Sequence, residues 1–280
     1  MITLTTPADM QAWSLARRAE GQRIGCVPTM GCLHNGHLSL VTRAQAATDV
    51  TVLTLFVNPT QFGPNEDYAR YPRTFEADCA LAKAEGADAV FAPPVEEVYP
   101  AGATTFIDVA GVSDRLDGKS RAGHFRGVAT VVAKLLIAAE PDRAFFGQKD
   151  AAQVAVLRRM VADLLLATEI EVCPIVREAD GLALSSRNVF LSAAEREQAL
   201  TLSRTIRQAE AMVAGGERRA STLIEAARRT FAAEQEIRVD YIEAVSWVTL
   251  EPVEIAAPGT LFAVAAWVGA TRLIDNTILP

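Results

Sequence analysis

Residues 24–40 constrain the fold more than any other stretch of this sequence. The first four are apolar and predict a short buried strand that ends at Pro28, because proline cannot donate to a central sheet. Gly31 and Gly36 then frame a turn, and apolar residues recur at helical spacing from His37 onward. A strand, a glycine-bearing loop and a helix start in this order direct backbone N–H groups and the positive helix end at one point. This arrangement predicts a phosphate-binding site.

Expected strands and helices alternate through roughly the first 175 residues. The expected strands cover residues 24–27, 50–57, 89–91, 104–109, 143–146 and 169–173, and the expected helices cover residues 9–20, 75–85, 128–139 and 151–166, besides the one that starts at His37. Such alternation is typical of a parallel sheet with helices on both faces. We therefore predict an α/β fold with a doubly wound, Rossmann-like sheet, whose ligands bind beyond the carboxyl ends of the strands.

The pattern changes after Arg177. Ser192 and Glu195 form a capping box that opens a long helix. A second helix is expected over residues 221–234, followed by strands near residues 239–243, 261–268 and 272–274. We therefore predict two domains, a Rossmann-like domain over residues 1–176 and a smaller α+β domain over residues 177–280.

Composition narrows the class of protein. The chain has 280 residues, half of them hydrophobic, which suits one large and one small domain with a sizeable core. A formal net charge of -7 argues against a nucleic-acid surface or a basic membrane patch. No apolar run reaches membrane-spanning length, and the first residues lack the pattern of a signal peptide. The four cysteines are scattered without a CxxC pair, so we expect free thiols and a cytoplasmic protein.

Two of the three histidines in the chain lie at the first helix start. His34 lies in the loop and His37 in the first turn, so their rings can share one side of the helix. Imidazoles there can donate to phosphate oxygens and stabilise charge that builds up during displacement. The alternative is structural, with one histidine capping the helix and the other filling a half-buried position.

A second chemically informative loop follows the strand at residues 143–146. Gly147 allows a ligand to approach the backbone, and Lys149 offers a point charge suited to phosphate. Asp150 has two interpretations, a ligand contact or a helix cap paired with Gln153.

Two further groups of residues are weaker candidates. Ser185, Ser186 and Arg187 can wrap a triphosphate, although such a turn is more often a solvated loop. Asn58 and Gln61 are common turn residues, yet their amides suit a small polar acid without adding charge.

The last candidates concern an anion and a metal. His124 with Arg126 suits an anion, with a solvated loop as the equal alternative. Asp78 can help to hold a magnesium ion that is bound mainly by phosphates, although a solvent-facing carboxylate is the stronger expectation. The sequence contains no HExxH motif and no paired Cys/His set, so a zinc site is not expected.

Six blocks of this sequence closely resemble the pantoate–β-alanine ligase family, and they stand in that family's order. The blocks are residues 28–37, 56–63, 71–74, 123–127, 146–150 and 180–188. The first block alone, with its His-x-Gly-His element, would indicate only the wider nucleotidylyltransferase superfamily. The resemblance implies an enzyme of coenzyme A precursor biosynthesis that condenses (R)-pantoate with β-alanine. ATP first gives pantoyl adenylate and pyrophosphate, and β-alanine then displaces AMP to give pantothenate.

The resemblance also implies the site residues. The catalytic residues would be His34, His37, Lys149 and Arg187. The ATP site would comprise Met30, Gly31, Cys32, Leu33, His34, Asn35, Gly36, His37, Gly147, Gln148, Lys149, Asp150, Val176, Leu184, Ser185, Ser186 and Arg187. Gln61 would bind pantoate and border β-alanine, Gln153 would bind pantoate, and Asn58 would belong to the substrate pocket. Mg²⁺ would enter with ATP, Asp78 would be its candidate protein ligand, and the chain would form a homodimer.

Two other functions share part of this pattern. An adenylyltransferase that leaves AMP on its product needs the His-x-Gly-His element but not the acid pocket of Gln61 and Gln153. A non-catalytic nucleotide-binding module has no reason to combine His37 and Lys149 with such a pocket. Loop position and the resemblance together predict a hinge near residues 176–180, on which the C-terminal domain closes over ATP as a lid.

Overall fold

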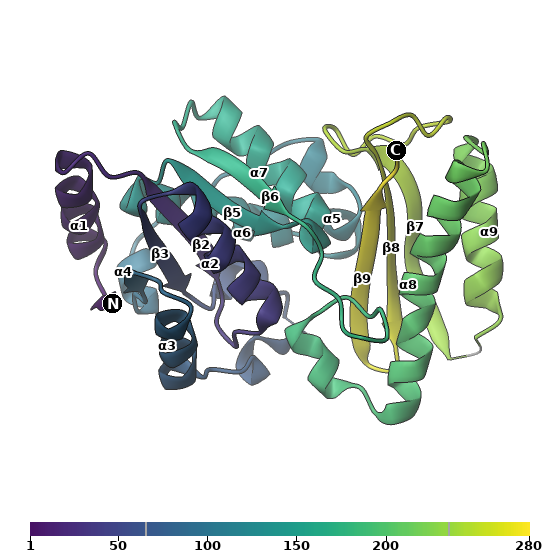
Figure 1. Cartoon of the computed structure of the whole chain (residues 1–280), viewed down its shortest axis with the longest axis horizontal. Helices are drawn as coiled ribbons and strands as arrows, with labels where there is room; N and C mark the ends of the chain where they lie inside the picture. Colours follow the sequence, from purple (N-terminus) through teal and green to yellow (C-terminus); the bar gives the residue numbers. More distant parts are fainter. Residues whose placement is uncertain (65, 235) are drawn as a thin grey trace.

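The computed structural model describes residues 1–64, 66–234 and 236–280 of the chain and shows two separate sheets (Figure 1). The larger sheet has six strands in the order β1-β4-β3-β2-β5-β6, and its paired strands are all parallel. Its strands are β1 (Ile2–Leu4), β2 (Ile24–Thr29), β3 (Val50–Leu55), β4 (Ala89–Phe91), β5 (Arg143–Gly147) and β6 (Glu169–Cys173). The parallel sheet predicted from the sequence is confirmed.

Helices cover both faces of this sheet. They are α1 (Pro7–Ala19), α2 (Asn35–Ala47), α3 (Phe75–Ala84), α4 (Val95–Val98), α5 (Asp117–Ser120), α6 (His124–Ala139) and α7 (Ala151–Asp163). Successive residues of a strand face opposite sides. Val27 therefore packs with Leu40 of α2, whereas Cys26 packs in the cluster that contains Val132 of α6. Both faces are buried, so the sheet is doubly wound as predicted.

The strand order places the crevice of the sheet beside β2. From β2 the chain runs outward through β3 and β4, and it later returns to add β5 on the opposite side of β2. The loops that follow β2 and β5 consequently diverge at the carboxyl edge of the sheet. In open α/β sheets this switch point is where ligands bind.

Proline 28 lies inside β2, so the prediction that the strand stops before it is wrong. The N–H of Phe56 donates to the carbonyl of Thr29, which shows that Thr29 directs its backbone toward β3. Pro28 therefore directs its backbone toward β5, where pairing has already ended at Cys26. The missing donor costs no ladder bond there, and the early end of β2–β5 pairing helps to open the crevice.

Most other predicted elements differ from the structure by a few residues at their ends, and two predictions differ more. Residues 104–109 form no strand, because this segment packs on α6 rather than on the sheet, and the N–H of Ile107 donates to the hydroxyl of Thr130 at 2.9 Å. Helix α6 begins at His124 instead of Val128. The short strand β1 was not predicted, since three residues at a sheet edge give too little periodicity.

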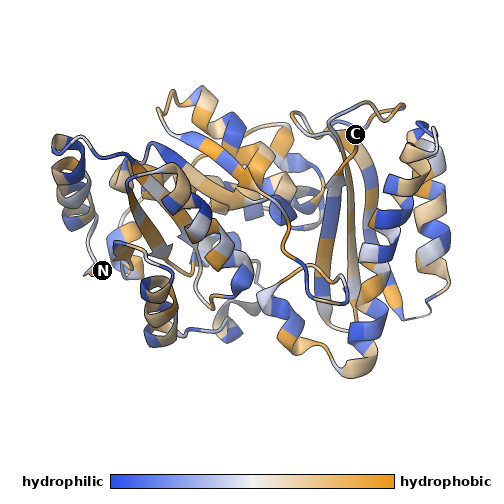
Figure 2. Cartoon of the chain, viewed as in Figure 1, coloured by the Kyte–Doolittle hydropathy of each residue, from blue (hydrophilic) through white to orange (hydrophobic). Residues whose placement is uncertain are grey.

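The C-terminal part forms an antiparallel sheet covered by two helices. Its strands β7 (Ile237–Ser246), β8 (Thr260–Val268) and β9 (Thr271–Ile278) lie against α8 (Ala193–Ala214) and α9 (Ala220–Ala232). Leu202, Ile206 and Phe262 belong to a core of its own. Hydrophilic residues mark much of the α8 and α9 surface, whereas hydrophobic residues concentrate on the larger sheet (Figure 2). The predicted small α+β unit is confirmed.

Residues 174–192 link β6 of the larger sheet to α8 of the C-terminal part, and Val176 lies in this linker. The domain boundary after Val176 stays a prediction. Ser192 and Glu195 form the predicted capping box at the start of α8. The two parts also touch, since the half-buried Trp247 donates its indole N–H to the carbonyl of Ala151 at 3.2 Å. Within the described residues, no helix combines the length and the apolar character needed to cross a bilayer.

Candidate active site

Histidines 34 and 37 stack on each other at the start of α2, with ring centroids 4.0 Å apart. Nδ1 of His34 accepts the N–H of Gly36 at 3.1 Å, and Nδ1 of His37 accepts the N–H of His34 at 3.4 Å. Both rings therefore cap the helix, whereas the structural alternative assigned that role to only one of them. A neutral imidazole whose Nδ1 accepts must carry its proton on Nε2. The two caps thus leave each ring with an Nε2–H group as a donor for a ligand.

The electrostatic surroundings keep both rings neutral. Burial, followed by the neighbouring His34 and the Lys149 ammonium, lowers the pKa of His37 to about 3. Burial and then Lys149 also lower the pKa of His34. Because the charge of Lys149 lowers the pKa of both histidines, Lys149 in the loop after β5 lies near the histidine loop that follows β2.

Asp78 shapes the loop after β2 from beneath. Its carboxylate is only 3% exposed and accepts the N–H groups of Cys32 at 2.9 Å and Leu33 at 2.8 Å. The hydroxyl of Thr74 donates to it as well, at 3.1 Å. The expectation of a solvent-facing carboxylate is therefore wrong. These two N–H groups, together with that of Gly36, are already paired, so side chains rather than a bare backbone cradle must supply most donors of this loop.

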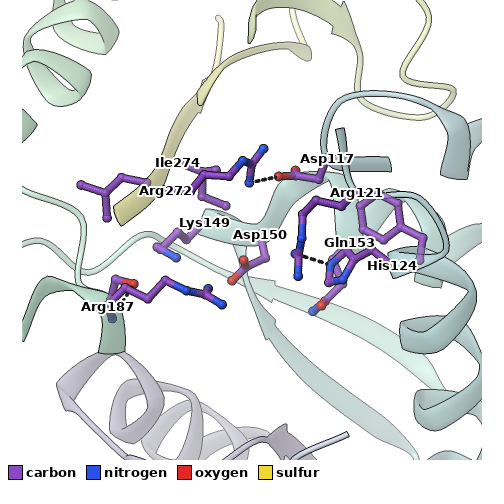
Figure 3. Close-up of a pocket in the computed structure, with 12 residues that line it drawn as sticks. Asp117, Arg121, His124, Lys149, Asp150, Gln153, Arg187, Arg272 and Ile274 are labelled. Atoms are coloured by element: carbon purple, nitrogen blue, oxygen red, sulfur yellow. Dashed lines mark hydrogen bonds and ion pairs between the residues drawn. The ribbon is translucent and has the colours of Figure 1, made fainter. Parts of the chain in front are cut away.

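Lys149 stands in the turn between β5 and α7. This 3-10 turn, η4 (Gln148–Asp150), follows Gly147 at the end of β5. The Lys149 ammonium is half-buried and makes no hydrogen bond or ion pair with any described residue. Asp150 precedes α7 without a side-chain capping bond, so the capping interpretation of Asp150 is wrong. Its carboxylate instead lies beside Lys149 and Arg187 at the mouth of a pocket (Figure 3).

Arg187 reaches the same pocket from the linker. The hydroxyl of Ser185 accepts the N–H of Arg187 at 3.2 Å and begins the 3-10 turn η5 (Ser186–Phe190). Arg187, Lys149 and Ser185 line an open pocket of about 470 Å³. Arg187 and His37 also line a second pocket of about 890 Å³, which adjoins the first. The structure thus places Lys149, Arg187 and His37 around two adjoining pockets, while His34, which lines neither of them, stacks on His37.

The larger pocket combines an apolar wall with side-chain amides. The wall includes Phe56, Val128, Val131, Val132, Leu135 and Phe146. Gln61 and Gln153 both line this pocket. Asn58 also borders it, but its buried amide donates to Gln61 Oε1 at 3.0 Å and to the Gly127 carbonyl at 3.1 Å. Asn58 consequently orients Gln61, and the pocket suits a small acid with both hydroxyl and methyl groups.

His124 lines both pockets, whereas Arg126 does not. His124 Nδ1 lies 2.9 Å from the carbonyl of Gln61, and its Nε2 lies 2.8 Å from a guanidinium nitrogen of Arg121. Arg126 instead pairs with Asp108 and lies over the ring of Phe106. The expected pairing of His124 with Arg126 is therefore wrong. Arg121 takes that place, and its guanidinium forms two 2.7 Å bonds with the Glu66 carboxylate.

We expect His124 to make the fold sensitive to acid. Burial and the nearby Arg121 charge lower the pKa of His124 from 6.5 to about 4. Between pH 6.5 and about pH 4, His124 is therefore protonated in the unfolded chain but neutral in the folded protein. The free energy of unfolding consequently falls as the pH drops through this range. The loss approaches about 3 kcal/mol for this group. Urea unfolding between neutral pH and about pH 4 should show a shallower pH slope for His124→Gln than for the wild-type protein. An identical slope in both proteins would contradict this assignment.

The remaining expected nucleotide contacts lie where the linker approaches α2. The N–H of Leu184 donates to the carbonyl of Val176 at 2.9 Å, so these two positions form a short paired segment. The nearest side-chain atom of Leu184 lies 3.8 Å from the position that a Cβ on Gly36 would occupy. Both residues are therefore close to the histidine loop, and their direct contact with a nucleotide stays a prediction.

A family model described as Pantoate-beta-alanine ligase matches residues 2–278. The chain belongs to this family. It is 62% identical over 256 residues to a pantothenate synthetase of Acidobacterium capsulatum, an alignment that covers 91% of this chain and 86% of that relative. A pantothenate synthetase of Thermotoga neapolitana is 53% identical over 279 residues, with full coverage of both chains.

Solved structures agree with the assignment to the pantoate–β-alanine ligase family. The pantothenate synthetase of Thermus thermophilus superposes over the whole of both chains with a TM-score of 0.95 at 44% identity. The pantoate–β-alanine ligase of Francisella tularensis, complexed with Beta-gamma ATP and Beta-alanine, gives a TM-score of 0.80 at 33% identity. The superposition covers 99% of this chain and 97% of that one. The family resemblance seen in the sequence blocks is confirmed.

The sequence did not predict one part of the smaller pocket, the ion-paired residues around Arg272. Arg272 of β9 lines the smaller pocket and donates to the carboxylates of Asp117 and Asp240, each at 2.7 Å. Tyr241 donates its hydroxyl to Asp117 at 3.1 Å. These residues join the C-terminal sheet to α5, beside Arg121. No local signal reveals such a link, because Arg272 and Asp117 are 155 positions apart.

Proposed function

We propose that this protein condenses (R)-pantoate with β-alanine at the cost of ATP, giving pantothenate, AMP and pyrophosphate through a pantoyl-adenylate intermediate. Membership of the ligase family gives the overall reaction. The single observation that carries the site assignment is the joining of two pockets with different chemistry. One is lined by Lys149, Ser185 and Arg187, and the other, which Arg187 also lines, combines His37 with side-chain amides and an apolar wall.

In the first step, a pantoate carboxylate oxygen attacks the α-phosphorus of ATP. A new phosphorus–oxygen bond forms, the bond to the β-phosphate bridging oxygen breaks, and pyrophosphate leaves with the electron pair. Negative charge grows on the leaving group during this displacement. We assign its stabilisation to Lys149, Arg187 and the Nε2–H groups of His34 and His37. Lys149 and Arg187 line the smaller pocket, Arg187 and His37 line the adjoining one, and His34 stacks on His37.

The larger pocket fits pantoate in this scheme. Pantoate carries a carboxylate, two hydroxyl groups and two methyl groups on one carbon. Gln61 and Gln153 would hold its polar groups, and the valines of α6 would pack against the methyl groups. Asn58 and His124 would act on pantoate indirectly, since both bond to Gln61.

In the second step, the free amine of β-alanine attacks the acyl carbon of the adenylate. A carbon–nitrogen bond forms, the bond to the AMP oxygen breaks, and the amine loses a proton to solvent or to the departing phosphate. Gln61 would border β-alanine as well as pantoate. No covalent bond to the enzyme is needed, because holding two reactants in sequence supplies much of the acceleration.

Magnesium enters this proposal as part of the substrate MgATP. Among the residues that the structure describes, no group of three His, Cys, Asp or Glu side chains can hold a metal ion. Asp78 is an unsuitable ligand, since its oxygens already accept from Cys32 and Leu33. The ion would be held mainly by phosphates, as is usual for Mg²⁺.

We also propose a cytoplasmic homodimer. Its four free cysteines are compatible with a reducing compartment.

The decisive experiment incubates the protein with MgATP and pantoate, with and without β-alanine. We expect pyrophosphate release to require pantoate, and AMP release to require β-alanine as well. Pantothenate and AMP should then appear in equal amounts. AMP retained on a stable product would favour an adenylyltransferase, and ATP binding without turnover would favour a non-catalytic nucleotide-binding module.

A further inference from the structure

We propose that Asn276, in the last strand of the C-terminal domain, is a positioning residue that holds Lys149 in place for the phosphates of ATP. This inference rests on the proposed function. Asn276 is 3% exposed and lies on β9, 127 positions from Lys149 along the chain. It does not line either pocket, so its action is through Lys149 rather than on the substrate.

The amide of Asn276 is fully engaged by the turn that carries the lysine. Its Nδ2 atom donates one hydrogen to the Gln148 carbonyl at 3.0 Å and the other to the Lys149 carbonyl at 2.9 Å. Its Oδ1 atom accepts from the Gln148 side chain at 3.3 Å. A single buried amide thus satisfies two consecutive carbonyls of a turn, which fixes the local backbone orientation.

Lys149 needs such support because its own side chain has none. The ammonium forms no hydrogen bond or ion pair with the described residues, so its position depends on where the backbone points it. The turn is only three residues long and lies between the end of β5 and the start of α7. A rotation of this turn would move the ammonium while leaving β5 and α7 folded.

The strand β9 is well placed to hold the turn. It pairs only with β8 among the described strands, and its other edge faces the larger domain (Figure 1). The neighbouring Asp275 binds Arg177 of the linker through two bonds of 2.7 and 2.9 Å, and it also accepts the N–H of Asn276. One rigid strand therefore sets both the linker and the lysine turn, so the position of the C-terminal domain is transmitted to the phosphate site.

The test compares two nucleotides by calorimetry. A non-hydrolysable β,γ-methylene analogue of ATP carries the phosphates that Lys149 would contact, whereas AMP lacks the two outer ones. For Asn276→Ala, we expect affinity for the analogue to fall about 10-fold and affinity for AMP to change less than about 2-fold. In a Lys149→Ala background, the same substitution should no longer affect binding of the analogue. This loss of effect separates a positioning role from general destabilisation.

Two further variants keep the result interpretable. Asn276→Leu keeps a side chain of similar shape and removes both N–H donors without adding a charge, so it should weaken binding of the analogue as Asn276→Ala does, even if alanine impairs folding. Thr277→Val is the matched control, because it removes one hydrogen bond, to Glu210, from the next residue of β9. It should bind both nucleotides as the wild-type protein does.

Three results would overturn the inference. These are equal losses for AMP and the analogue, the same loss in the Lys149→Ala background, or wild-type binding by both Asn276 variants. Failure of the wild-type protein to bind the analogue would instead refute the proposed function. The two failures are therefore distinguishable.

Discussion

Replacing Lys149 by alanine is expected to lower the rate of pantoyl-adenylate formation by about 10³-fold and to leave the fold intact. The ammonium has no structural partner among the described residues, so its removal breaks no bond within the protein. Its charge is nevertheless close enough to lower the pKa of both His34 and His37. A cation that the fold does not need, held beside two neutral donors, is expected to act on the charge that develops as pyrophosphate leaves.

The measurement is single-turnover release of pyrophosphate from MgATP with saturating pantoate. Lys83→Ala is the matched control, because Lys83 is an exposed lysine in the last turn of α3 and lines neither pocket. It should retain wild-type turnover. Melting temperatures of both variants should stay close to that of the wild-type protein. Turnover of Lys149→Ala within a few fold of the wild-type rate would remove this residue from the mechanism.

The alternation of strands and helices was predictable because most of these elements are long enough to show their own period. The strand at residues 169–173 has the predicted bounds. The site loops were predictable for a related reason. In a parallel sheet, residues that follow strands gather at one edge, so the positions of His37 and Lys149 in the sequence already imply their proximity.

The errors arose where tertiary contacts override local signals. Pro28 is tolerated in β2 because the neighbouring strand has already separated, which depends on the register of β5. Asp78 was expected at the surface because it lies in the first turn of a helix, yet it is buried beneath the histidine loop. No sequence period links Asp78 to Cys32, or Asn276 to Lys149. Such pairs are fixed only when the chain has folded.

The histidine stack shows that a structural role and a catalytic role need not compete. The sequence left open whether these histidines cap the helix or bind phosphate. In the structure, each ring uses Nδ1 for the cap, and this bond fixes the tautomer that presents Nε2–H. The cap is therefore what orients the donor. A side chain with only one polar atom cannot do both.

Because Nδ1 caps the helix and Nε2–H is left for the substrate, substitutions of His37 that keep only one of these two groups are expected to change the adenylation rate strongly. In His37→Asn, the amide oxygen can replace Nδ1 as the acceptor for the His34 N–H, but no donor reaches the Nε2 position. We expect a folded protein whose adenylation rate is about 10³-fold lower. In His37→Gln, the longer side chain can place an amide N–H near the Nε2 position. We expect this variant to retain more activity, within about 10- to 100-fold of the wild-type rate.

The pH dependence distinguishes a neutral donor from a protonated one. Because the pKa of His37 in the free protein is about 3, the imidazole ring is neutral throughout the pH range in which activity would be measured. The kcat/KM for ATP should therefore not decline between about pH 6 and 8 through loss of an imidazolium with the usual pKa near 6.5. A decline with that midpoint in the wild-type protein, absent from His37→Gln, would show that the ring acts as an acid. A flat profile in both proteins, with His37→Asn losing much more of its rate than His37→Gln, would identify Nε2–H as a fixed neutral donor.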